Sequence, residues 1–78
     1  MPGYMLNTYG DYIYLGDEPQ VMLHNLRRYW AEYLLDPANH QIDEVSKRVA
    51  ILDKEYSSAE ELRLVLNNSG LGIIQSMD

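Results

Sequence analysis

The chain has 78 residues, no cysteine and a formal net charge of −6 at pH 7, with 46% hydrophobic and 23% charged residues. A chain of this length forms one small domain at most, and its composition is that of a globular protein and not of a disordered one. The lack of cysteine excludes disulfides and thiolate metal sites, and the deficit of Lys and Arg argues against a general affinity for nucleic acid or anionic membranes.

A small domain without disulfides gains limited stability from its core, so we expect support from a partner or from a second copy of the chain. The first residues lack the basic start and apolar core of a signal peptide, and the apolar runs are far shorter than a membrane span. We therefore expect one domain over residues 1–78, in a soluble cytoplasmic protein.

The first predicted element is a strand over residues 9–15. Its residues are largely aromatic or aliphatic and alternate along the chain, which places Tyr12 and Tyr14 on one face and the aliphatic residues on the other. Gly10 and Gly16 stand at the two ends of this run, where glycine commonly interrupts a strand.

A helix is predicted next, with Asp17 as its N-terminal cap. Pro19 suits the first turn because its missing N–H has no partner there, and Gln20 completes a D-x-x-Q capping box. The helix should end at Asp36, because a residue before proline is disfavoured in the helical conformation, and a polar turn over residues 38–40 then reverses the chain. The apolar face of this helix consists of Met22, Leu23, Leu26, Tyr29, Trp30, Tyr33 and Leu34.

A second helix is predicted over residues 42–56. Its apolar residues recur at helical spacing, at Ile42, Val45, Val49, Leu52 and Tyr56. Two acid-to-base pairs at i,i+4 spacing support it, namely Asp43 with Lys47 and Glu44 with Arg48. The alternative is a strand over residues 47–53, since a β-rich run before a loop and a helix is typical of a βαβ unit.

The third helix begins with Ser58-Ala59-Glu60-Glu61, an S-x-x-E capping box, and Gly70 is placed to take the left-handed conformation at its C-terminal end. Residues 71–75 form a short apolar run, which we expect to pair with residues 12–15 in a two-stranded sheet. The predicted fold is therefore α+β with the order β-α-α-α-β, and the alternative strand over residues 47–53 would change it to β-α-β-α-β.

The sequence contains no catalytic motif. A metal site would need His24 and His40 to converge with a carboxylate such as Glu44, and nothing like H-E-x-x-H is present. The serines fall in caps, turns and helix surfaces, without a nucleophile elbow or a P-loop. We therefore expect two solvated histidines, no cofactor, no metal ion and no enzymatic activity.

The use of tyrosine is the feature that points to binding. The chain has seven tyrosines and no phenylalanine, and a phenol combines apolar area with a polar tip, which suits surfaces that are wet when free and buried when bound. Residues 1–26 also contain no Lys or Arg. The predicted partner-binding residues are Tyr9, Asp11, Tyr12, Tyr14, Asp17 and Glu18. The plainer interpretation is that these tyrosines cover the edge of the core with their hydroxyls in water.

Arg27 and Arg28 form the basic feature that best suits a contact with a phosphate or a carboxylate. The plainer interpretation is that Arg28 pairs with Glu32 one turn further along the predicted helix.

The functional hypothesis is a small acidic protein–protein interaction module. We expect it to act as a regulator or inhibitor, including one encoded by a phage or mobile element, and to bind a protein partner and form a homodimer through free strand edges. The alternative is a nucleic-acid-binding regulator, in which basic residues of the helices gather on one face: Arg27, Arg28, Lys47, Arg48 and Lys54.

Overall fold

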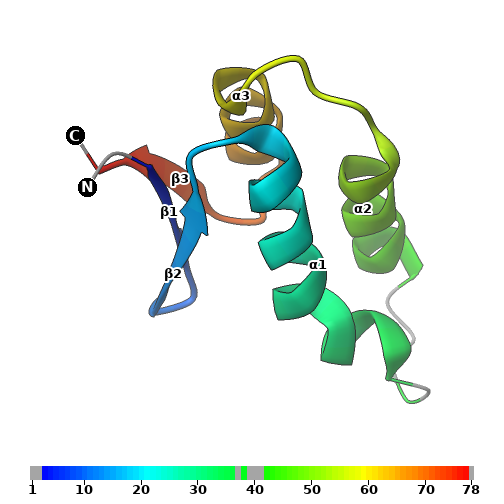
Figure 1. The fold of residues 1–78 in the computed structure, drawn as a ribbon. Coiled ribbons are helices and arrows are strands. Elements are labelled where there is room, and N and C mark those ends of the chain that lie inside the picture. Colours follow the sequence, from blue (N-terminus) through cyan, green and yellow to red (C-terminus); the bar gives the residue numbers. More distant parts are fainter. Residues whose placement is uncertain (1–2, 37, 39–41, 78) are drawn as a thin grey trace.

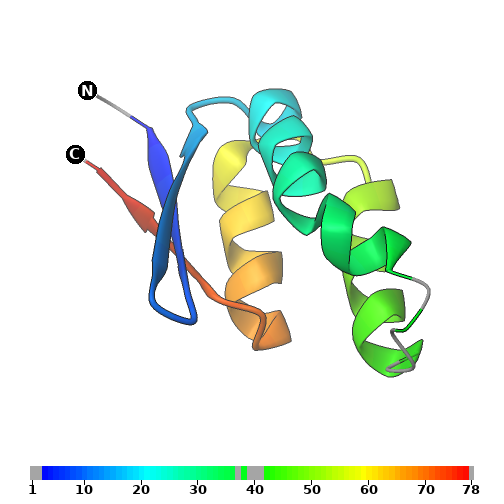
Figure 2. The same ribbon diagram turned by 90° about the horizontal axis from the view of Figure 1, so that it is seen from below.

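A computed structural model of the chain describes residues 3–36, 38 and 42–77, and it confirms the predicted α+β class. In chain order the elements are β1 (Tyr4–Thr8), β2 (Asp11–Gly16), α1 (Pro19–Leu35), α2 (Ile42–Asp53), α3 (Ala59–Ser69) and β3 (Ile73–Ser76). The strands form one antiparallel sheet in the order β2-β1-β3. Figures 1 and 2 show α1 and α3 against one face of this sheet, with α2 packed on their far side, so the other face is left without a helix.

The sheet begins with a hairpin that the sequence analysis missed. The predicted strand over residues 9–15 was wrong at its start, because Tyr9 and Gly10 form the turn between β1 and β2. Both turn residues have positive φ, 47° and 87°, and two-residue turns of this kind match the twist of antiparallel strands. Gly10 therefore connects two strands and does not merely precede one.

Strand β1 lies in the centre of the sheet and pairs with both neighbours. Leu6 is opposite Ile13 of β2 and Ile74 of β3. The predicted pairing of residues 71–75 with residues 12–15 was therefore wrong, since β1 separates the two strands. The sheet has three strands and not two because β1 supplies the central partner for both.

The boundaries of α1 follow local backbone chemistry. Pro19 stands in the first turn, as predicted, and Asp36 is the C-terminal cap in an extended conformation, with φ −70° and ψ 113°. The capping box from Asp17 to Gln20 was wrong: Glu18 is the N-terminal cap, with φ −121° and ψ 147°, and its side chain forms no capping hydrogen bond. Asp17 lies one residue too early to reach the first free amides. Two residues of the predicted turn, 39 and 40, lie outside the described part of the chain.

The helical prediction for residues 42–56 is confirmed over most of its length, and the alternative strand over residues 47–53 was wrong. The predicted apolar face was rotated, because Ile42 and Val49 are exposed while Arg48, Ile51 and Leu52 are buried. Tyr56 lies beyond the helix and donates a hydrogen bond to the Ile51 carbonyl at 2.9 Å.

The acid-to-base pairs of α2 are partly as predicted. Arg48 pairs with Glu44, but Lys47 pairs with Glu44 at 3.2 Å and not with Asp43. Glu44 therefore accepts hydrogen bonds from two cations on one side of the helix. Asp43 lies in the first turn, where the helix dipole stabilises a negative charge.

Helix α3 has the predicted caps. The Ser58 hydroxyl oxygen accepts a hydrogen bond from the Glu61 amide at 3.2 Å, and Gly70 ends the helix with φ 78°. The Glu61 carboxylate accepts from the amide and hydroxyl of Ser57, at 3.0 and 2.7 Å, in place of the Ser58 amide expected in a full capping box.

The core lies between the covered face of the sheet and helices α1 and α3. Trp30 extends it toward α2 and is only 4% exposed. The largest fully buried side chains are Leu6, Leu15, Met22, Leu26, Leu62, Leu66 and Ile74. Each of the three strands thus contributes a residue to the core, and the other face of the sheet points away from the helices.

Candidate functional site

The uncovered face of the sheet carries a neutral, partly apolar surface, which we call the outer face. Because Leu6 and Ile74 point into the core, their strand neighbours point the other way. The outer face consists of Met5, Asn7, Tyr12, Tyr14, Ile73 and Gln75. The strand register arranges these residues in two rows across the sheet, and Figure 2 shows that no helix covers this side.

The first row runs from Tyr12 through Asn7 to Ile73, and the second from Tyr14 through Met5 to Gln75. Tyr12 is 67% exposed and Ile73 is 48% exposed, so large apolar groups stand at both edges of one row. Exposed residues of this kind, gathered on one face without charge, are typical of contact surfaces.

The Tyr14 ring lies directly against the backbone of Gly3. A Cβ atom at Gly3 would be only 2.7 Å from the Tyr14 hydroxyl oxygen, so residue 3 must be a glycine for the ring to lie there. Tyr14 is consequently less exposed than Tyr12 and is partly a structural residue of the sheet.

The other predicted partner-binding residues border the outer face. Tyr9 stands at the hairpin turn and is 85% exposed. Asp11 accepts a hydrogen bond from the Tyr29 hydroxyl at 3.2 Å, which turns it toward α1. Asp17 and Glu18 are exposed in the connection from β2 to α1. The structure therefore brings Tyr12 and Tyr14 together, as predicted, and places the acids at the two ends of β2.

Arg27 and Arg28 lie on α1, and they point to different neighbours. Arg27 donates to the Leu52 carbonyl at 3.3 Å and so links α1 to α2. Arg28 is exposed beside a small cavity that Ile13, Tyr14, Asn25 and Tyr29 also line. Among the ion pairs of the described residues, the expected pair of Arg28 with Glu32 is not found.

Four of the five basic residues named for the nucleic-acid alternative, Arg27, Lys47, Arg48 and Lys54, have partners within the fold. Lys47 pairs with Glu44, and Lys54 pairs with Glu61 at 3.7 Å. Arg48 is buried, with 7% of its surface exposed. This arrangement gives little support to the nucleic-acid alternative, which needs these cations on one open face.

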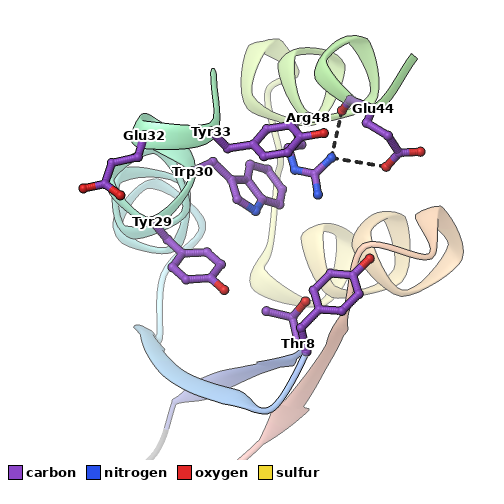
Figure 3. Close-up of a pocket in the computed structure, with 8 residues that line it drawn as sticks. Thr8, Tyr29, Trp30, Glu32, Tyr33, Glu44 and Arg48 are labelled. Carbon is purple, nitrogen blue, oxygen red and sulfur yellow. Dashed lines mark hydrogen bonds and ion pairs between the residues drawn. The ribbon is translucent and has the colours of Figure 1, made fainter. Parts of the chain in front are cut away.

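A second candidate site is a cavity of about 770 Å³ between the hairpin turn, α1 and α2 (Figure 3). Sequence reasoning did not find it, because its residues come from three separate elements. It is lined by Thr8, Tyr9, Tyr29, Trp30, Glu32, Tyr33, Glu44 and Arg48. We call it the Arg48 cavity. Burial and the hydrogen bond to Asp11 raise the pKa of the Tyr29 phenol at its edge.

The guanidinium of Arg48 is held between rings and one acid. Its central carbon lies 4.3 Å from the centre of the Tyr33 ring and 5.5 Å from that of Trp30, within the range of cation–π contacts. Nη1 donates to the Glu44 carbonyl at 2.9 Å and to the Glu44 carboxylate at 3.3 Å. The hydrogen bonds from Lys47 and then Arg48 lower the pKa of Glu44.

The sequence did carry one signal for the burial of Arg48. Residue 48 stands three and four positions before Ile51 and Leu52, so it shares their helix face. We predicted Arg48 as half of an ion pair with Glu44 and, in the nucleic-acid alternative, as part of an open basic face, whereas the aromatic rings of α1 cover it.

The described residues give no support to a metal site or a membrane span. Among residues 3–36, 38 and 42–77, no three His, Asp or Glu side chains gather closely enough to hold a metal ion. The hypothetical site with His24 and Glu44 also required His40, which lies outside the described residues. Within the same part of the chain, every helix is too short or too polar to cross a membrane. In comparisons with known proteins, no family model, no curated protein and no solved structure matches this chain.

Proposed function

We propose that this chain is a protein-interaction module that binds a protein partner through the outer face of its sheet. The observation that carries the proposal is the composition of that face: six outward side chains from three strands, all neutral, including Tyr12, Tyr14 and Ile73. Neutral surfaces that combine tyrosine with aliphatic groups are typical of the central part of protein interfaces.

The charges around the outer face favour a partner with basic residues. All six Lys and Arg residues lie between residues 27 and 63, in the helical part of the chain. Asp11, Asp17 and Glu18 border β2, and no cation of the sheet offsets them. A second copy bound face to face would bring two acidic borders together, whereas a partner with Lys or Arg around an apolar patch would be complementary.

The size of the molecule limits how such a partner can bind. The chain exposes 5117 Å² in total, and a standard interface takes roughly 800 Å² from each partner, about a sixth of this surface. The partner must therefore cover most of the sheet face together with the hairpin turn. A small chain that occupies a surface of this size would act as a regulator or inhibitor of the protein that it covers.

A homodimer is the second candidate, and the free sheet edges favour it. Strands β2 and β3 each have one unpaired edge in the order β2-β1-β3. Pairing of these edges between two copies would extend the sheet and remove exposed backbone groups. This dimer would leave the outer face free, so the two candidates can be separated by mutation.

The test uses two outward residues of one row, replaced together as Tyr12→Ser and Ile73→Ser. Neither side chain belongs to the core, so circular dichroism should keep its helical signal. Binding partners are captured on the tagged chain from cells that make it, and the solution mass is measured by light scattering. We expect the captured protein to be lost from the double variant, because aromatic anchors commonly account for about 2 kcal/mol or more of binding free energy.

Leu64→Ser is the matched control. Leu64 lies on α3 and is 50% exposed, close to the exposure of Ile73, but α3 lies on the covered side of the sheet. The control should bind the partner like the unchanged chain. Equal capture by all three chains would contradict the proposal. If the chain is a dimer and the double variant has the same mass, self-association occurs through the strand edges and not through the outer face.

A further inference from the structure

One edge of the Arg48 guanidinium has no hydrogen-bond acceptor. A guanidinium carries five N–H donors, and Nη1 is the nitrogen that donates to Glu44. Nε is buried and has no partner, and no hydrogen bond from Nη2 is found within the described residues. A buried N–H without an acceptor is costly, so the site is more stable when an acceptor reaches this edge.

The unpaired edge has the geometry that carboxylates recognise. Nε and Nη2 lie side by side and donate in parallel, which fits the two oxygens of one carboxylate. Figure 3 shows the Arg48 guanidinium pointing into the cavity, with Trp30 beside it and Thr8 and Tyr29 on the opposite side. The Tyr33 ring and Glu44 fix the orientation of the guanidinium before any ligand binds.

The lining of the cavity restricts the ligand further. Glu32 and Glu44 also line it, so a ligand with several negative charges would be repelled. Tyr29, Trp30 and Tyr33 supply aromatic walls, and the volume is within the usual range of pockets for small organic molecules. Both features favour one carboxylate on a flat apolar body.

We propose that the Arg48 cavity binds a monocarboxylate attached to an aromatic ring. The carboxylate accepts a hydrogen bond from Nη2 of Arg48 and reaches the buried Nε once the side chains that cover Nε shift. The ring of the ligand lies against Tyr29 and Trp30. Such a group belongs either to a free aromatic acid or to the C-terminal residue of a peptide. The site is on the helical side of the sheet and does not depend on the function proposed for the outer face.

The chain provides its own reporter for this binding. Trp30 is the sole tryptophan and lines the cavity, so its fluorescence should respond to a ligand there. Phenylacetate is compared with phenylacetamide, which has a similar shape but no charge. We expect saturable binding of the acid and binding of the amide that is about tenfold weaker or more. Equal affinity for both, or no saturable response to the acid, would overturn the proposal.

Arg48→Lys tests the planar guanidinium. Lysine keeps the positive charge but lacks the paired donors, so we expect its affinity for phenylacetate to fall by about tenfold. Arg28→Lys is the matched control, because Arg28 is exposed on α1 and does not line the cavity. An Arg48→Lys variant that folds and binds phenylacetate as tightly as the unchanged chain would contradict the assignment.

A measurement on the unchanged chain covers the case in which Arg48→Lys does not fold. In a nitrogen–proton NMR titration, the Nε–H signal of Arg48 should move with phenylacetate and stay with phenylacetamide. The Nε–H signal of Arg63, which donates to Glu60 at 2.8 Å, should stay in both titrations. A stationary Arg48 signal during binding of the acid would overturn the proposal.

A peptide distinguishes the two sources of the carboxylate. A short peptide that ends in phenylalanine is compared with its C-terminal amide and with phenylacetate. Tighter binding of the peptide acid than of phenylacetate supports a site for a chain terminus, and the reverse order supports a site for a free acid. A peptide amide that binds as tightly as the peptide acid would contradict the role given to Arg48.

Discussion

The sheet and the helices of this protein are held in different ways. Helices α2 and α3 carry polar contacts between residues close in sequence, such as Glu44 with Arg48 and Glu60 with Arg63. The sheet depends on contacts between distant residues: β1 pairs with β3, and the Thr8 hydroxyl donates to the Leu71 carbonyl at 3.0 Å. Local contacts therefore support α2 and α3, whereas nonlocal contacts attach the sheet and leave its outer face open.

The ion pairs also distinguish the helical part of the molecule from the sheet. The four ion pairs found in the described residues all join side chains of α2, α3 or their connection, and the sheet contributes to none of them. Surface ion pairs of this kind contribute little to stability, whereas a buried arginine must be matched by several contacts. Arg48 differs from the other basic residues of these ion pairs, because it is only 7% exposed and its Nε has no hydrogen-bond partner.

The largest effect should come from the residue that attaches the sheet. Leu6 is fully buried in the central strand, opposite Ile13 and Ile74. Leu6→Ala should lower the free energy of unfolding by about 2–5 kcal/mol, because it removes buried apolar surface and leaves a cavity. The check is chemical denaturation followed by circular dichroism.

Met5→Ala is the matched control for Leu6→Ala. Met5 is the adjacent residue of the same strand but belongs to the outer face, so its loss should cost under about 1 kcal/mol. If the two variants were equally stable, the sheet would not be attached through its covered face as described.

The division also explains which parts of the fold the sequence could predict. The position of Pro19 in the first turn of α1, the end of α1 at Asp36 and the caps of α3 at Ser58 and Gly70 all depend on the backbone preferences of nearby residues. These features were predicted from a few residues that are adjacent in the sequence. The capping role of Asp17 failed by one residue, because the last extended residue before α1 is Glu18.

The parts that failed depend on distant residues. Strand β1 contains the polar residues Asn7 and Thr8 and lacks a β-branched run, so its pattern alone did not indicate a central strand. Its place is determined by β2 on one side and β3 on the other. The burial of Arg48 likewise depends on Trp30 and Tyr33, which lie on another helix.

The outer face was predicted in part. Period-two alternation placed Tyr12 and Tyr14 on one side of a strand, and the structure agrees. The same pattern did not reveal that Met5 and Ile73 belong to this face, because their register is set by the pairing of β1 with both neighbours.

A middle-sized effect is expected from the cap of α3. Ser58→Ala removes the hydroxyl oxygen that accepts from the Glu61 amide, and loss of such a cap costs about 1 kcal/mol. Ser46→Ala is the control, since Ser46 is exposed within α2 and alanine favours helix by a few tenths of a kcal/mol there. Denaturation midpoints of both variants should therefore move in opposite directions. A shift of the same sign in both would argue against a capping role for Ser58.

The smallest effect concerns the acids of the helices. The hydrogen bond from Arg63 lowers the pKa of Glu60 below its ordinary value of 4.5. A carboxyl whose pKa is lower in the folded chain stabilises the fold above its ordinary pKa, and this contribution is lost as the pH falls through the folded value. Glu60→Gln should therefore be slightly less stable than the unchanged chain at pH 7, and the difference should vanish at pH values well below 4.5.

Comparing the unchanged chain with the Glu60→Gln variant at each pH isolates the Glu60 ion pair. All other acidic side chains are the same in both chains, so their protonation affects the two stabilities equally. Urea denaturation midpoints measured from pH 7 down to pH 3 supply the difference. A difference that grew on acidification would mean that Glu60 is held better in its protonated form, against the hydrogen bonds that it accepts from Arg63. The same exposed pair should respond to salt, whereas association through the uncharged outer face should depend on salt mainly through its acidic border.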